Sequence, residues 1–189
     1  MVDCLLLFGV AISIVFPKRR IWPPPTKDSW QFWVSWICSA IGMTGSPFVG
    51  ILDFETLGHR HWILLFIGGL AILMGGGIAI WGTTTLSAHQ SLGLKGKLMT
   101  DGPYQYSRNP QYVGFILMYG GIILFTFSLM ALLTGTMVML VFAVLPFSEE
   151  PWLRQQYGAA YDDYCRDVPR FIGLRSFKQR LEGARVMKS

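Results

Sequence analysis

The chain has 189 residues, of which 52% are hydrophobic and only 14% are charged. Soluble domains usually carry about 25% charged residues, so this composition and the mean hydropathy of +0.42 exclude an ordinary soluble domain. They predict an all-helical protein that crosses a membrane several times. The net charge of +5 is spread over segments that flank apolar stretches, which favours membrane lipids and not nucleic acid as partners.

Three cysteines, Cys4, Cys38 and Cys165, lie far apart in the sequence. Their odd number and wide spacing predict neither a disulfide framework nor a metal site. No internal repeat or soluble domain interrupts the apolar pattern. We therefore expect one membrane-embedded domain over residues 1–189, with N-terminal spans in 1–85 and the functional region in 86–173.

The first apolar span is expected at Val2–Phe16. A signal peptide is the competing interpretation, but the usual basic n-region is missing and no small-residue cleavage site follows. The next segment contains Trp22-Pro23-Pro24-Pro25, which predicts a stiff polyproline-like linker. We expect this linker to be a spacer that runs along the membrane surface.

The second span is expected at Trp30–Leu52, with Asp28 or Ser29 as its N-cap. The third is expected at Trp62–Trp81, where a tryptophan at each end marks the two headgroup levels. Glycines in this third span, including the run Gly75–Gly77, give it little bulk. Small residues of this kind predict close approach of a neighbouring helix.

The longest uncharged segment begins after Arg108 and ends before Glu149. A single helix of that length would measure about 60 Å, roughly twice the thickness of a bilayer's hydrocarbon core. Two spans that fold back on each other, Pro110–Phe125 and Leu129–Phe147, fit better, with Thr134–Thr136 as another possible turn. This hairpin would bring Arg108 and the acidic pair that starts at Glu149 to one membrane surface.

Lysine and arginine residues alternate between the two sides of this arrangement. They are concentrated after the first, third and fifth spans, whereas segment 53–61 carries only Arg60. The positive-inside rule then places the N-terminus outside and the C-terminus, with the polar clusters, in the cytoplasm.

The tail from Glu149 to about Arg166 has the pattern of an amphipathic helix, and Val168-Pro169 is expected to end it. Glu149 and Glu150 would then occupy its first turn, where the helix dipole favours anions. Two adjacent carboxylates at a membrane boundary would also be stabilised by a cation or by hydroxyl groups. The pair therefore has both a structural and a ligand-binding interpretation.

The cluster at the start of the fourth span has the same two interpretations. Asn109 is expected as an N-cap, Pro110 at the first helical position, and Arg108 as an interfacial anchor. The lone His89 is typical of a solvated loop and does not predict a metal site. The basic segment 95–103 lacks the spacing of a phosphate loop, so a soluble nucleotide-binding fold is not indicated.

Several short motifs follow one another in the C-terminal half, from about Leu86 to Gly173. They are Gly102-Pro103-Tyr104, Arg108-Asn109-Pro110-x-Tyr112-x-Gly114, Glu149-Glu150-x-x-Leu153, Tyr157-Gly158-x-x-Tyr161-x-x-Tyr164 and Val168-Pro169-Arg170. In this order they resemble the integral-membrane methyltransferase family that includes isoprenylcysteine carboxyl methyltransferases and phospholipid N-methyltransferases. The N-terminal spans match that family only in hydropathy.

The resemblance implies a helical membrane fold with five or more spans, a C-terminal hairpin and S-adenosylmethionine (SAM) as methyl donor. It implies a cofactor site at the cytoplasmic ends of the last helices, with Arg108 and Glu150 as the catalytic pair. The residues implied to contact the cofactor are His89, Gly96, Lys97, Leu98, Met99, Tyr104, Asn109, Pro110, Gln111, Tyr112, Glu149 and Glu150.

Two positions depart from the family pattern. Asn109 stands where the family commonly has a histidine, so a titrating role is excluded there. The segment 144–147 lacks the arginine that prenylcysteine enzymes tend to carry before the glutamates, which argues against a prenylated protein C-terminus as substrate.

The expected function is SAM-dependent methyl transfer to a lipid-like or prenylcysteine-like acceptor. The acceptor is left open among a prenylated cysteine, a phosphatidylethanolamine and a small hydrophobic thiol or acid, as is the oligomeric state. Sterol reductases also resemble this region, but they bind a nicotinamide cofactor and are typically longer. A non-enzymatic membrane protein that kept the fold is the third alternative.

Overall fold

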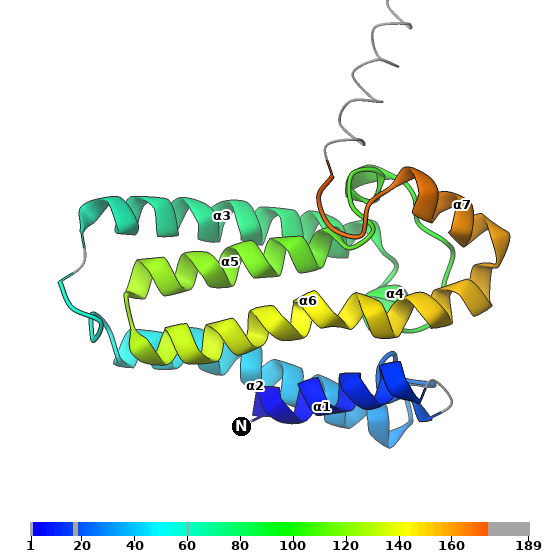
Figure 1. Ribbon diagram of the computed structural model, residues 1–189, viewed down its shortest axis with the longest axis horizontal. Coiled ribbons are helices and arrows are strands. Elements are labelled where there is room, and N and C mark those ends of the chain that lie inside the picture. Colours follow the sequence, from blue (N-terminus) through cyan, green and yellow to red (C-terminus); the bar gives the residue numbers. More distant parts are fainter. Residues whose placement is uncertain (1, 17–18, 60, 174–189) are drawn as a thin grey trace, which may run out of the picture.

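The computed structural model describes residues 2–16, 19–59 and 61–173, and these residues contain helices and no strand (Figure 1). The all-helical prediction is therefore confirmed for the described part of the chain. The elements are α1 (Val2–Val15), α2 (Trp30–Leu52), α3 (Trp62–Thr85), α4 (Ala88–Ser91), the 3₁₀ turn η2 (Gly102–Gln105), α5 (Pro110–Thr126), α6 (Leu129–Tyr157) and α7 (Ala159–Asp167).

The long helices form a bundle in which α5 packs between α3 and α6, and α6 also packs against α1 and α2. Figure 1 shows that α4, η2 and α7 gather at one end of this bundle, beside the C-terminal part of α6. The loop between α2 and α3 and the turn between α5 and α6 lie at the opposite end. The loops that carry the predicted site residues therefore share one end.

Helices α2, α3 and α6 are each long and apolar enough to cross a membrane, while α1 and α5 are shorter apolar helices. Large apolar side chains project outward from them, among them Leu73, which is 74% exposed. In water such a surface would be strongly unfavourable. The prediction of a helical integral membrane protein is confirmed.

Helix α1 (Val2–Val15) matches the expected first span, Val2–Phe16, to within one residue and is short. It has 14 residues, a length of about 21 Å, and it starts beside the middle of α2. There the carboxylate of Asp3 lies against Gly42.

Glycines allow α3 and α5 to pack backbone to backbone. A Cβ atom added at Gly75 would lie 2.6 Å from the carbonyl oxygen of Gly114, and one added at Gly121 would lie 2.7 Å from the carbonyl oxygen of Gly68. These distances are too short for a real Cβ. The close approach predicted from the small residues is therefore present, and it fixes α5 against α3 in antiparallel orientation.

The chain reverses direction between α5 and α6, as expected. Phe127 has a left-handed backbone (φ 48°), and the hydroxyl of Ser128 caps α6 by accepting from the amide of Ala131 at 3.0 Å. The alternative turn site, Thr134–Thr136, lies inside α6. The reversal returns the chain to the end of the bundle that it left at the start of α5.

The predicted end of the fifth span at Phe147 is wrong. Helix α6 continues through Pro146 and Pro151 to Tyr157, so Glu149 and Glu150 lie inside it and not in the first turn of a tail helix. A proline inside a helix costs about 3 kcal/mol, but side-chain contacts to both glutamates hold this segment in place. The expected tail helix is split at Gly158 (φ 56°), and α7 ends just before Val168-Pro169, as predicted.

Candidate active site

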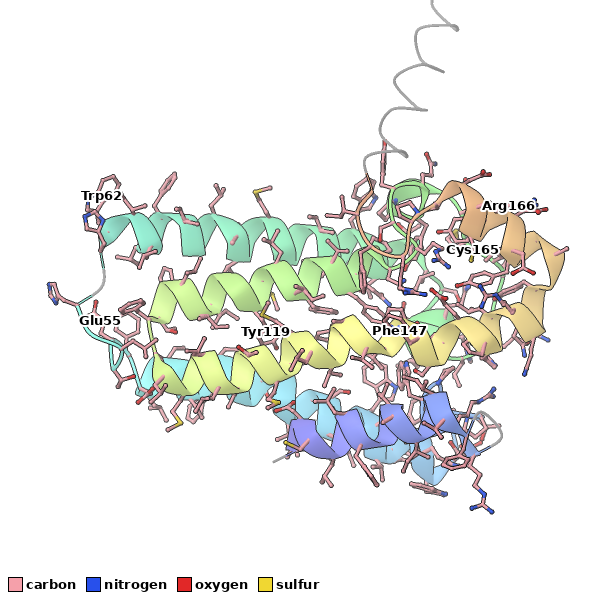
Figure 2. The ribbon with its side chains drawn as sticks, viewed as in Figure 1. Glu55, Trp62, Tyr119, Phe147, Cys165 and Arg166 are labelled. Carbon is pink, nitrogen blue, oxygen red and sulfur yellow. The ribbon has the colours of Figure 1, made fainter. Side chains whose placement is uncertain are left out.

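A pocket lies at the end of the bundle where α4, η2 and α7 gather. Its walls come from the linker after α1, the loop after α3, the start of α5, the extended part of α6 and α7. Figure 2 shows Phe147 and Cys165 at this end, whereas Glu55 and Trp62 lie at the other. The extension of α6 beyond the apolar span therefore supplies one wall of the pocket.

Arg108 links the start of α5 to α6 and to the segment after α7. Its Nη1 atom lies 3.2 Å from Oε1 of Glu150 and donates to Sγ of Cys165 at 2.6 Å. Its backbone amide donates to the carbonyl oxygen of Pro169 at 2.9 Å. The predicted meeting of Arg108 with the acidic pair is therefore present in the structure.

The Nε atom of Arg108 is buried and has no hydrogen-bond partner. Buried donors are nearly always paired because an unpaired one costs about 1–3 kcal/mol. Arg108 lines the pocket, so this unpaired donor belongs to a residue of the pocket wall.

Glu150 is buried between two guanidinium groups and does not line the pocket. Besides Arg108, it accepts from Arg170, whose Nε and Nη2 atoms donate to its two oxygens at 2.6 and 2.9 Å. This fork geometry favours a strong charge-assisted pair, and the hydrogen bond to Glu150 raises the pKa of Arg170. The Arg170 guanidinium also stacks 4.0 Å from the centre of the Phe147 ring. Glu150 thus holds Arg108 in place.

Glu149 differs from its neighbour because it lines the pocket. Its Oε1 atom accepts from Nε1 of Trp22 at 2.6 Å and from the hydroxyl of Tyr112. In the described residues no arginine or lysine pairs with it. Glu149 therefore presents a carboxylate to the pocket that neutral donors orient.

The linker after α1 is a wall of the site, so the expectation of a surface spacer is wrong. Pro23 and Pro24 are fully buried. The hydroxyl of Ser13 accepts from the amides of Ile21 and Trp22 at 2.8 and 3.1 Å. These two bonds turn the chain back at the end of α1 and point the Trp22 indole toward Glu149.

The segment after α7 fastens the start of α5. The amide group of Asn109 donates to the carbonyl oxygen of Arg170 at 2.9 Å, and the hydroxyl of Ser107 donates to the same oxygen at 3.3 Å. Asn109 occupies the N-cap position of α5, but its side chain makes no capping bond. The expected capping role is replaced by this contact. Pro110 takes the first helical position, as expected.

The loop between α4 and η2 is held across the pocket from both sides. Ser87 and Gln90 form a capping box on α4, and the Gln90 amide also donates to the carbonyl oxygen of Lys97. From the other side, the hydroxyl of Tyr157 donates to the carbonyl oxygen of Gly96 at 2.7 Å. A Cβ atom at Gly96 would collide with the side chain of Gln90, so a larger residue at this position would force Gln90 to move.

Tyrosines from η2 and α7 line the pocket between the loop and α7. The hydroxyl of Tyr164 donates to the carbonyl oxygen of Tyr104 at 2.6 Å. The hydroxyl of Tyr104 donates to the carbonyl oxygen of Gly82 at 3.3 Å. Burial is the main cause that raises the pKa of Tyr104, Tyr161 and Tyr164. These phenols stay neutral at physiological pH and offer uncharged ring faces.

Most of the predicted site residues line this pocket: Lys97, Leu98, Met99, Tyr104, Arg108, Asn109, Gln111, Tyr112 and Glu149. Four others do not. His89 is exposed, and Pro110 is buried at the start of α5. The carbonyl oxygen of Gly96 accepts a hydrogen bond from Tyr157, and Glu150 forms an ion pair with Arg108.

The sequence-based list missed several lining residues: Trp22, Gln90, Leu94, Trp152, Tyr157, Tyr161 and Tyr164. The tyrosines recur at spacings of three and four, which is typical of one helix face, and this signal could have identified them. Trp22 lies in the N-terminal half and pairs with a residue far away in the sequence, so no local pattern indicated it.

Comparison with known proteins supports the same region. The family model described as phospholipid methyltransferase matches residues 63–160, a little over half of the chain. The match runs from the start of α3 into α7 and includes Arg108, Glu149 and Glu150. Neither the curated proteins nor the solved structures contain a match to the chain. The match of the family model to more than half of the chain shows that the chain belongs to the phospholipid methyltransferase family.

Proposed function

We propose that this protein transfers a methyl group from SAM to a lipid-like acceptor, and that the pocket between α5, α6 and α7 holds the cofactor. The observation that carries the proposal is that the pocket wall contains both a hydrogen-bond donor group and a carboxylate. Arg108 offers a buried unpaired donor, and Glu149 offers a carboxylate held by neutral donors.

The chemistry of these residues fits SAM. Arg108 would hold the carboxylate of its amino-acid part, and Glu149 would accept from its amino group or ribose hydroxyls. The tyrosine and tryptophan faces favour a sulfonium by cation–π attraction. The pocket volume is about 110 Å³, so part of a ligand as large as SAM has to extend beyond it.

Bound SAM supplies an electrophilic methyl group, so the residues of the site mainly have to align an acceptor with it. The buried ion pair of Arg108 and Glu150 fixes the cofactor end of the pocket. The loop across the pocket and the tyrosines exclude water. Orientation of this kind accounts for a large share of the rate in a two-substrate reaction.

The acceptor decides whether a base is required. A carboxylate acceptor needs none, whereas an ammonium acceptor must first lose a proton. Glu149 is the group in the pocket wall that can take this proton, because Glu150 is already bonded to two arginines.

The site end of the bundle is proposed to face the cytoplasm. The basic side chains Arg19, Arg20, Lys95, Lys97, Arg154 and Arg166 belong to segments that meet at this end (Figure 1). A surplus of lysine and arginine is typical of the cytoplasmic side. A water-soluble cofactor would then enter directly from the cytoplasm.

Titration calorimetry of the purified protein with SAM and with NADPH tests the proposal. We expect heat of binding for SAM and none for NADPH. Glu149→Gln should weaken SAM at least tenfold, because the replacement keeps the shape and removes the charge. Binding of NADPH in place of SAM would support a reductase, and binding of neither would support a non-enzymatic protein.

A further inference from the structure

A second cavity, of about 440 Å³, lies between α1, α2, α5 and α6. It adjoins the cofactor pocket, because Trp22, Ser91, Gln111 and Tyr112 line both. Trp22 and Tyr112 are also the two donors to Glu149. The carboxylate of Glu149 is therefore hydrogen-bonded to two residues that line both spaces.

The cavity opens toward the surrounding lipid. Leu5, Phe8 and Val34 line it, and these residues are 62%, 67% and 45% exposed. All three lie on α1 and α2. An apolar molecule can thus enter sideways from the bilayer between these two helices.

The lining chemistry restricts what can enter. None of the described residues that line this cavity is charged, so a phosphate group inside it would have no counter-charge. The volume suits a drug-sized molecule, for which pockets of about 300–1,000 Å³ are usual. A two-chain phospholipid is larger than this and carries a phosphate.

A polar group within the cavity also has no partner. Ser35 is 2% exposed and lines the cavity, and its hydroxyl makes no hydrogen bond. A serine in a membrane helix usually bonds a carbonyl oxygen one turn earlier. The cavity wall therefore contains a buried hydroxyl group that has no hydrogen-bond partner.

We infer that this cavity binds the methyl acceptor, and that the acceptor is an amine carrying a single apolar chain. The chain would fill the cavity between α1 and α2, and the amine would reach the junction at Tyr112. There it meets the Glu149 carboxylate, which attracts an ammonium group and repels a carboxylate or phosphate.

The inference rests on the proposed function and completes its chemistry. The acceptor nitrogen gives a proton to the Glu149 carboxylate and uses its freed electron pair to form the new C–N bond. The C–S bond breaks at the same time, and its electrons stay on sulfur as S-adenosylhomocysteine leaves.

Cys38 provides a direct test because it lines the cavity, whereas Cys4 on α1 is exposed and does not line it. The full-length protein in phosphatidylcholine nanodiscs is treated with N-ethylmaleimide, and alkylation of each cysteine is measured by peptide mass spectrometry. Hexadecylamine should slow alkylation of Cys38 at least fivefold and leave Cys4 unchanged. Palmitate and added phosphatidylethanolamine should have at least tenfold weaker effects.

Two variants of adjacent residues on α2 give a second readout that does not depend on cysteine reactivity. Ser39→Phe fills the cavity, whereas Ala40→Phe adds the same ring at an exposed position. Hexadecylamine should raise the Tm of the wild type and of Ala40→Phe, but not that of Ser39→Phe. Ser35→Ala should weaken hexadecylamine binding about threefold to tenfold.

The inference is overturned if palmitate or phosphatidylethanolamine protects Cys38 as well as hexadecylamine does, or if Ser39→Phe responds to the amine like Ala40→Phe. Parallel titration with SAM separates the two proposals. SAM binding without these amine effects refutes the acceptor assignment alone, whereas amine effects without SAM binding refute the methyltransferase proposal.

Discussion

At the scale of single residues, two adjacent glutamates have different tasks. The side chain of Glu150 is 8% exposed and pairs with Arg108 and Arg170, so it mainly stabilises the structure of the site. Glu149 faces the pocket and is hydrogen-bonded only by neutral donors, so it is the glutamate that we propose to contact ligands. The sequence placed both carboxylates near Arg108, but it could not separate them. Their difference depends on which way each side chain leaves a helix that was expected to end before them.

Replacing Glu150 should destabilise the protein more than replacing Glu149. Glu150→Gln leaves two arginines without their buried counter-charge, and breaking a buried pair typically costs about 3–5 kcal/mol. Thermal unfolding in detergent should show a clearly lower Tm for Glu150→Gln and a nearly unchanged Tm for Glu149→Gln.

The exposed pair of Arg154 and Asp162, with 50% and 60% exposed side chains, is the matched control. Asp162→Asn should change stability by less than about 1 kcal/mol. Equal losses for Glu150→Gln and Asp162→Asn would contradict the structural role of Glu150.

The indole of Trp22 is predicted to orient Glu149. Trp22→Phe keeps an aromatic ring and removes the donor to Oε1, so SAM affinity should fall about fivefold to tenfold, which corresponds to about 1 kcal/mol. Trp30→Phe alters an exposed tryptophan and should leave the affinity unchanged. If both variants bind SAM like the wild type, the linker has no role in the site.

At the scale of elements, close helix packing and polar ties at helix ends position the site. The glycine face of α3 suggested close packing, and the charge-free segment suggested the hairpin of α5 and α6. The extension of α6 could not be read locally, because Pro146 and Pro151 argue against a helix there. Contacts from the linker and from the segment after α7 decide the outcome, and both come from distant parts of the chain.

The packing of α3 on α5 predicts a large difference between two similar substitutions. Gly75→Ala places a Cβ 2.5 Å from the amide nitrogen of Met118, and overpacking of this kind costs about 1–3 kcal/mol. Gly77→Ala meets nothing within 4 Å and should be neutral or slightly stabilising. Equal Tm values for the two variants would contradict the packing.

Asp53 joins the end of α2 to the start of α6. It accepts from the amide of Met130 at 2.8 Å and from the hydroxyls of Ser128 and Thr56 at 2.7 and 2.8 Å. These bonds, chiefly the one from Met130, lower the pKa of Asp53. Because the pKa is lowered in the folded state, the ionised carboxylate stabilises the fold at pH values above the ordinary aspartate pKa of about 3.9. This contribution is lost as the pH falls below that value.

Asp53→Asn should therefore lower the Tm more at pH 7 than at pH 3, where the wild type has lost part of the same contribution. Asp101→Asn is the control, because Asp101 is exposed and makes no capping bond at η2. A Tm difference for Asp53→Asn that stays constant from pH 7 to pH 3 would contradict the role of the charge.

At the scale of the whole molecule, segments from both halves of the chain build one end of the bundle. The order of apolar spans, the hairpin and the meeting of Arg108 with the glutamates followed from hydropathy, charge spacing and family motifs. The contribution of α1 and its linker did not, because Trp22 and Ser13 act through contacts that no local pattern encodes. This N-terminal part supplies Trp22 to the pocket that contains Arg108 and Glu149 and, with α2, most of the neighbouring cavity.

Ultraviolet crosslinking of methyl-labelled SAM, followed by peptide mapping, tests the central claim most directly. If one pocket is formed by the start of α5 and the extended part of α6, labelled peptides should come from both 97–112 and 149–164. Excess S-adenosylhomocysteine should abolish both. Label confined to other helices, or label that the competitor does not reduce, would contradict the account.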